Sequence, residues 1–169
     1  MVAFHGQMGM FTRALAYILS HGADGLRQVA EDAVLNANYV LRSLEDVLDA
    51  PFAASGPCMH EALFSDSGFG GGMSTLDLAK GLIDEGYHPM PVYFHLVVHG
   101  SMLVEPTETE SKEVLDTFVE VMGELLKQAA DDPERMKGAP YTTPVRRLDD
   151  VKAAKNLDLA YIAPVPARG

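Results

Sequence analysis

The sequence predicts an α+β fold, with helices packed on one face of a small, mostly antiparallel sheet that follows a long helix. Two kinds of pattern support this prediction. Apolar residues recur at helical spacing in four segments, and three short apolar runs bounded by turn residues are typical of strands. The order is helix, helix, strand, helix, strand, strand, helix. With 169 residues, 47% of them hydrophobic, the chain is long enough for one packed core.

The first 50 residues are predicted to be helical. Apolar side chains recur every three or four positions from Phe11 to Ile18, and "HGADG" at 21–25 interrupts the pattern. Asp24 is suited to cap a second, longer helix whose apolar face runs from Leu26 to Leu48. Pro51 ends that helix because proline lacks the backbone N–H that a helix interior requires.

The next segment combines a strand, a loop and a helix. "CMHEALF" at 58–64 predicts a strand, and "SDSGFGGGM" at 65–73 predicts a flexible loop. A helix begins at Ser74 or Thr75 and ends at Gly86.

A hairpin and a last helix complete the predicted domain. "PVYFHLVV" at 91–98 is the strongest strand pattern of the sequence, and a turn at His99-Gly100 joins it to a second strand, "SMLVE", at 101–105. A helix is expected from about 109 to 130. The proline-containing tail from 131 is expected to be an irregular arm. The predicted domains are therefore a helical segment at 1–50, an α+β domain at 51–130 and an arm at 131–169.

Composition excludes several classes of protein. A formal charge of −11 argues against a nucleic-acid surface, which requires a basic stripe. No apolar run reaches the roughly 18 residues of a membrane span, and the N-terminus does not resemble a signal peptide. The single cysteine, Cys58, excludes an internal disulfide framework and fits a reducing compartment. A cytoplasmic protein with no membrane or nucleic-acid partner is expected.

Two motif hypotheses are weak. "GFGGGM" at 68–73 places Met73 where a dinucleotide-binding loop needs its third glycine. His95 and His99 are four residues apart, and on a strand that spacing separates them by roughly 13 Å. Cys58 and His60 could share a strand face, but two ligands do not close a zinc site. We therefore expect neither a cofactor loop nor a metal site.

The acidic stretch "EPTETE" at 105–110 is partly explained by helix capping. Thr107 followed by Glu110 predicts a capping box, and Glu108 lies where the helix dipole favours negative charge. Capping leaves Glu105, at the end of the predicted strand, without an explanation.

The same stretch resembles a known family. "EPTETESKE" is similar to a signature near the C-terminus of glycine dehydrogenase (decarboxylating), the P-protein of the glycine cleavage system, in the subunit 2 form of the two-subunit bacterial enzymes. Five further stretches resemble that family in the same order, at 4–18, 31–44, 57–61, 76–94 and 142–155. The resemblance covers the chain from Phe4 to about Lys155.

The resemblance implies the small C-terminal domain of an aspartate-aminotransferase-like, pyridoxal-phosphate-dependent fold. That family decarboxylates glycine on the cofactor and passes the aminomethyl group to the lipoyl arm of the H-protein. The implied partners are the large domain or other subunit of the enzyme and the H-protein. The family's cofactor lysine follows a histidine, and none of this chain's six lysines does. The isolated chain is therefore expected to be a fragment or one piece of a split protein, without bound cofactor and without catalysis.

Two function classes remain open: a domain of that enzyme, and a non-catalytic α+β domain that self-associates or binds a partner as a degenerate remnant. Under the first, Glu105, Thr107 and Glu108 are expected at the mouth of the substrate cleft, by analogy with related enzymes. Arg146 and Arg147 are further cleft candidates, for a carboxylate. Because the first helices would lack the large domain as a packing partner, a homo-oligomer is also expected.

Overall fold

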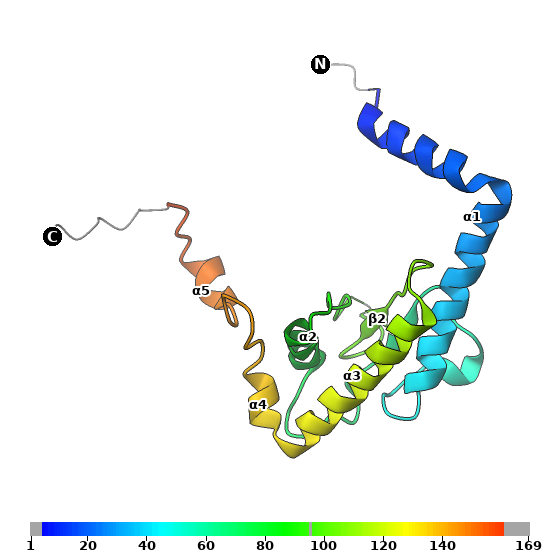
Figure 1. Ribbon diagram of the computed structural model, residues 1–169. Coiled ribbons are helices and arrows are strands. Elements are labelled where there is room, and N and C mark those ends of the chain that lie inside the picture. Colours follow the sequence, from blue (N-terminus) through cyan, green and yellow to red (C-terminus); the bar gives the residue numbers. More distant parts are fainter. Residues whose placement is uncertain (1–4, 95, 161–169) are drawn as a thin grey trace.

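The computed structural model describes residues 5–94 and 96–160, and within them the chain is α+β as predicted (Figure 1). The elements are α1 (Met8–Leu44), a 3-10 turn η1 (Ala53–Ser55), β1 (Ala62–Phe64), α2 (Thr75–Asp84), β2 (Met102–Val104), α3 (Lys112–Asp131), α4 (Pro133–Lys137) and α5 (Asp150–Lys155). Among the described residues, no helix is both long and apolar enough to cross a membrane.

Helix α1 has two parts that meet at Gly22. Gly22 has φ 65° and ψ −174°, which are non-helical angles that residues with a Cβ rarely adopt. The predicted break at "HGADG" is therefore present as a kink inside a helix of 37 residues. The part before the kink extends away from the body of the molecule (Figure 1), and residues 8–24 are all exposed. The part after it enters the core with Ala37, Val40, Leu41 and Leu44.

The sheet is smaller than predicted. Strands β1 and β2 pair antiparallel, with Ala62 opposite Val104 and Phe64 opposite Met102. The predicted strand at 91–98 is wrong: Val92 forms only an isolated bridge with Met102, and the chain turns at Tyr93, which has φ 60°. Leu96 and Val97 are 96% and 85% exposed. His95 lies outside the described residues.

The core lies between the sheet and three helices. Its largest fully buried side chains come from α1, β1, α2, β2 and α3: Val40, Leu44, Phe64, Leu78, Leu82, Met102 and Met122. Helix α3 contacts both α1 and α2, and α1 contacts β1. The second part of α1 therefore belongs to the same packed core as the segment at 51–130.

The ends of the last helices differ from the prediction. Helix α3 begins at Lys112, because the side chain of Ser111, not Thr107, accepts a hydrogen bond from the amide of Val114. The segment after 131 is not wholly irregular, since it contains α4 and α5. Asp132 caps α4 through the amide of Arg135, and Asp149 caps α5 through the amide of Lys152. In Figure 1, α5 lies away from the body, on the side opposite the α1 arm.

Candidate functional site

An open groove of about 510 Å³ lies between α1, the 87–91 segment, the end of β2 and the first turns of α3. Its wall is mainly apolar and includes Val40, Tyr87, Met90, Leu103, Val104, Val114 and Phe118. Its polar lining residues are His88, Glu105, Thr107 and Glu110. A concave apolar wall with a few polar groups is the usual composition of a ligand site.

Two stretches that resemble the family meet beside this groove. Because Ala62 pairs with Val104, the residues just outside the ladder, Glu61 and Glu105, lie next to each other. The imidazole Nε2 of His60 is 3.9 Å from a carboxylate oxygen of Glu61 and 3.8 Å from one of Glu105. The sequence prediction missed His60 and Glu61 as site candidates. The pairing of "CMHEALF" with "SMLVE" is the signal that could have found them.

These three residues, which we call the mouth cluster, have metal-ligand chemistry but an open setting. The candidate ligand atoms of His60, Glu61 and Glu105 all lie within 4.8 Å of one another. Their side chains are 38% to 53% exposed. Exposed groups of this kind are common without an ion, and the geometry alone does not assign a metal. The cluster instead concentrates negative charge beside the groove.

Side chains of α1 hold the loop at 105–111 in place. Asn36 donates to the backbone carbonyls of Thr107 and Glu110, at 2.9 and 3.2 Å. Tyr17, on the arm before the kink, donates its hydroxyl to a carboxylate oxygen of Glu108 at 3.2 Å. Desolvation raises the pKa of Tyr17, and the hydrogen bond to the anionic Glu108 raises it further. The Glu108 contact connects the arm to the body across the kink.

The predicted capping box is wrong, and the two residues have other positions. The amide of Glu110 donates to the carbonyl of Thr107 at 3.2 Å, which closes a turn before α3. The Thr107 hydroxyl shares a 2.7 Å hydrogen bond with that of Thr109. The structure instead forms a capping box at α2, where the carboxylate of Asp77 accepts from the backbone N–H of Ser74 at 2.8 Å.

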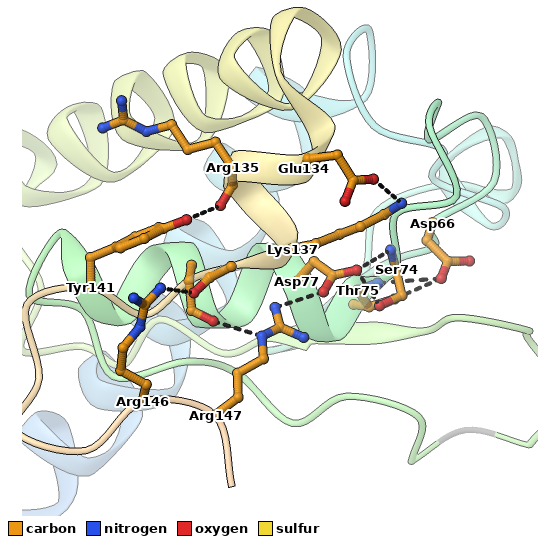
Figure 2. Close-up of polar contacts among 12 residues, drawn as sticks. Asp66, Ser74, Thr75, Asp77, Glu134, Arg135, Lys137, Tyr141, Arg146 and Arg147 are labelled. Carbon is orange, nitrogen blue, oxygen red and sulfur yellow. Dashed lines mark hydrogen bonds and ion pairs between the residues drawn. The ribbon is translucent and has the colours of Figure 1, made fainter. Parts of the chain in front are cut away.

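Arg146 and Arg147 lie elsewhere: Arg147 binds the tail to the body, and Arg146 makes its hydrogen bonds within the tail (Figure 2). Arg147 donates to Asp77 at 2.7 Å and to the carbonyl of Ala139 at 2.7 Å. Arg146 donates to the carbonyls of Gly138 and Pro140 and stacks over the ring of Tyr141, with its guanidinium carbon 4.2 Å from the ring centroid. Neither arginine lines the groove.

Two carboxylates of α2 receive this tail. The backbone N–H groups of Tyr141 and Thr142 both donate to Asp84 at 2.6 to 2.7 Å. Burial alone would raise the pKa of Asp84, but these hydrogen bonds and the nearby Arg146 outweigh it and lower the pKa. The same balance holds for Asp77, where hydrogen bonds from Ser74 and the charge of Arg147 outweigh desolvation and lower the pKa. We call Asp77, Asp84, Arg146 and Arg147 the tail clamp.

Comparison with known proteins identifies the family. The profile described as "Glycine dehydrogenase, C-terminal domain" matches residues 29–141, which is about two thirds of the chain. The chain belongs to this family. The matched range begins in the second part of α1 and ends after α4. It contains the groove and the mouth cluster, so the candidate site lies within the family domain.

Individual relatives agree with this assignment. A probable glycine dehydrogenase (decarboxylating) subunit 2 of Caulobacter vibrioides is 64% identical over 157 residues, covering 92% of this chain and 30% of the relative. Proteins with the same description from Kosmotoga olearia and Shouchella clausii are 46% and 48% identical, covering 95% and 94% of this chain and 33% and 32% of theirs. The chain therefore spans about a third of the length of these relatives.

Proposed function

We propose that this chain supplies the C-terminal domain of a glycine-decarboxylating P-protein. The complete enzyme would convert glycine and lipoyl H-protein into aminomethyl-lipoyl H-protein and CO2. The observation that carries the proposal is the 64% identity over nearly the whole chain to a probable glycine dehydrogenase (decarboxylating) subunit 2. The remaining two thirds of such an enzyme, on the same or another chain, are the principal partner, and the H-protein is the second. We place the enzyme in the cytoplasm.

The proposal assigns pyridoxal phosphate to the rest of the enzyme. None of the residues lining the groove is a lysine, and an aldimine with the cofactor needs a lysine amine. Two of the six lysines are in salt bridges on their own helices: Lys112 lies 2.7 Å from Asp116, and Lys137 lies 3.0 Å from Glu134. The residues of this chain therefore do not fit a cofactor site of their own.

The proposed contribution of this chain is the cleft wall next to the substrate. In this proposal the groove opens toward the reaction centre, with Glu105 and Thr107 on its lining and Glu108 held beside them by Tyr17. Carboxylates there would favour a protonated amino group over an anionic group. Arg146 and Arg147, the other cleft candidates, have a structural role in this proposal, because their guanidinium groups already bind backbone carbonyls and Asp77.

A chimera tests the proposed function. The segment of the Caulobacter vibrioides relative that aligns with this chain is replaced by the chain, and the chimera is assayed with its partner subunit, pyridoxal phosphate and H-protein. We expect exchange of the glycine carboxyl carbon with CO2 within about tenfold of the parent, a loss of no more than about 1.4 kcal/mol. A soluble, folded chimera without exchange would refute the proposal. The control is a chimera that carries the Shouchella clausii segment.

One observation favours self-association of the isolated chain as a second candidate. The arm of α1 before Gly22 exposes a run of large apolar side chains, among them Met8, Phe11, Leu15, Ile18 and Leu19, each at least 50% exposed. Soluble monomers rarely expose apolar patches beyond a few hundred Å². We expect a dimer in sedimentation velocity at tens of micromolar. A clean monomer at that concentration would argue against this candidate.

A further inference from the structure

We propose that the groove binds a protonated aliphatic primary amine, with the alkyl chain on the apolar wall and the ammonium group between Glu105 and Glu110. This deepens the proposed function: the aminomethylated lipoyl arm is an aliphatic chain that ends in a primary amine. Only that identification rests on the proposed function. The binding chemistry rests on the groove itself.

The groove offers apolar surface that solvent reaches. Leu103 and Val104 line it at the end of β2 and are buried, whereas Val114, on α3, is 44% exposed. Tyr87 and Phe118 are partly buried and meet edge to face, with ring centroids 5.4 Å apart. Each methylene that an occupant buries on such a wall improves affinity by up to about fourfold. A linear alkyl chain therefore fits the wall better than a compact polar molecule.

The polar lining of the groove determines which charge a bound head group can carry. Glu105 and Glu110 both line the groove, and no lysine or arginine does. The Glu105 carboxylate lies 3.8 Å from the imidazole of His60, and the carboxylate of Glu61 lies beside it. Among the described residues, no salt bridge or hydrogen bond is formed by the carboxylate of Glu110. An anionic head group would be repelled here, and a cation would be stabilised.

The loop that carries these carboxylates is held in position before any ligand binds. Asn36 fixes the carbonyls of Thr107 and Glu110, and Pro106 is buried between the two glutamates. A preorganised site loses less conformational entropy on binding than a mobile loop does. The geometry therefore favours a defined ammonium position over diffuse attraction to an acidic surface.

The experiment titrates the full 169-residue chain with n-hexylammonium chloride at pH 7.5 and follows backbone amides by two-dimensional NMR. Primary amines are protonated at this pH, as lysine is. We expect saturable shifts at Leu103, Val114 and Phe118. n-Hexanol should bind at least about threefold more weakly, since each exposed carboxylate–ammonium pair contributes about that factor. n-Butylammonium should bind up to about sixteenfold more weakly, because it has two fewer methylenes.

Matched variants locate the ammonium. Glu105→Gln and Glu110→Gln should each raise the dissociation constant of n-hexylammonium about threefold. Glu120→Gln, which removes an exposed carboxylate of α3 outside the groove, should leave it unchanged. Equal binding of hexanol and hexylammonium, or unchanged affinity in both groove variants, overturns the proposal. Amide shifts confined to surfaces other than the groove also overturn it. Concentration-dependent shifts of the groove amides without ligand would assign the groove to a second copy and also overturn it.

The two proposals can fail separately. The chimera measures turnover and does not depend on where a free alkylammonium binds. The NMR titration uses the isolated chain and does not depend on catalysis. An inactive chimera with hexylammonium bound in the groove would leave this inference standing and remove the proposed function. The reverse pattern would remove only this inference.

Discussion

Replacement of Asp77 by alanine should weaken both α2 and the attachment of the tail. Asp77 is 5% exposed, and its carboxylate accepts from Ser74 and from Arg147 (Figure 2). The first contact caps the helix that supplies Leu78 and Leu82 to the core. The second contact holds the chain that follows α4 against the body. One side chain therefore connects helix initiation to tail docking.

The cost can be estimated from these two contacts. Loss of an N-terminal cap costs about 1 kcal/mol. A hydrogen bond to a charged group contributes about 1.5 to 3 kcal/mol when buried. Because the Arg147 side chain is 33% exposed, solvent screening reduces that contribution to about 1 kcal/mol. Asp77→Ala should thus destabilise the protein by about 2 kcal/mol, which for a chain of this size lowers Tm by about 4 to 8 °C.

The assay is thermal and urea unfolding of wild type, Asp77→Ala, Arg147→Ala and the double variant. A double-mutant cycle should give a coupling free energy of about 1 kcal/mol between the two side chains. Arg147→Ala should cost less than Asp77→Ala, because the cap remains. A coupling below about 0.3 kcal/mol, which is the usual limit of additivity, would refute the assignment of Arg147 to the clamp.

The pH dependence of the same variants gives a second test. The pKa of Asp77 is lowered in the folded state, so its contribution to stability is complete above the unfolded-state pKa of about 3.9. The contribution is lost as pH falls through the lower, folded-state pKa. The stability difference between wild type and Asp77→Ala should be constant from pH 7 to about pH 4.5 and should shrink below about pH 4.

Three further predictions concern the core, the cleft and the cofactor. Phe64→Ala, at a side chain that is 0% exposed, should cost about 3 to 5 kcal/mol in urea unfolding; a cost below about 1 kcal/mol would contradict the packing described. In a full-length active relative, the change equivalent to Glu105→Gln should lower glycine–CO2 exchange, whereas the change equivalent to Thr107→Ala should mainly change Tm. If the Glu105→Gln equivalent keeps exchange within about twofold of wild type (a change below about 0.5 kcal/mol), Glu105 is not part of the site. Borohydride reduction of the isolated chain mixed with pyridoxal phosphate should label surface lysines slowly and without preference; one stoichiometric lysine would contradict this.

Helical periodicity predicted the helices well because each packs one apolar face on a common core. The core residues Leu41, Leu44, Leu78, Leu82 and Met122 all fall on the predicted faces. The break at "HGADG" was also predictable, because only glycine readily adopts the angles of Gly22. The merging of both parts into one kinked helix was not, since it depends on whether the chain resumes helical hydrogen bonds after the break.

The strand at 91–98 shows what an apolar run cannot reveal. Its first residues do contact the 101–105 segment, but not in the register of a turn at His99-Gly100, since Leu103 donates to the carbonyl of Pro91 and Tyr93 donates to that of Ser101. The positive φ of Tyr93 then ends the ladder. Leu96 and Val97 are apolar yet exposed, so strand propensity there is not matched by burial within this chain.

The candidate site was predictable only in part. Glu105 was singled out because capping left it unexplained, and the structure places it on the groove. His60 and Glu61 were not, because their proximity to Glu105 depends on strand register rather than on sequence spacing. A capping box was predicted at Thr107 because Glu110 follows three residues later, whereas Ser74, expected only as a helix start, is followed by the shorter Asp77. The turn at Thr107–Glu110 displaces the start of α3 to Lys112.

Complementation in trans tests the central claim most directly. The Caulobacter vibrioides relative is expressed without the segment that aligns with this chain, and glycine–CO2 exchange is measured with partner subunit, cofactor and H-protein, before and after addition of this chain. The account predicts no exchange from either piece alone and saturable restoration of exchange when the two are mixed. Restoration by the relative's own segment but not by this chain, at concentrations where both are folded, would contradict it.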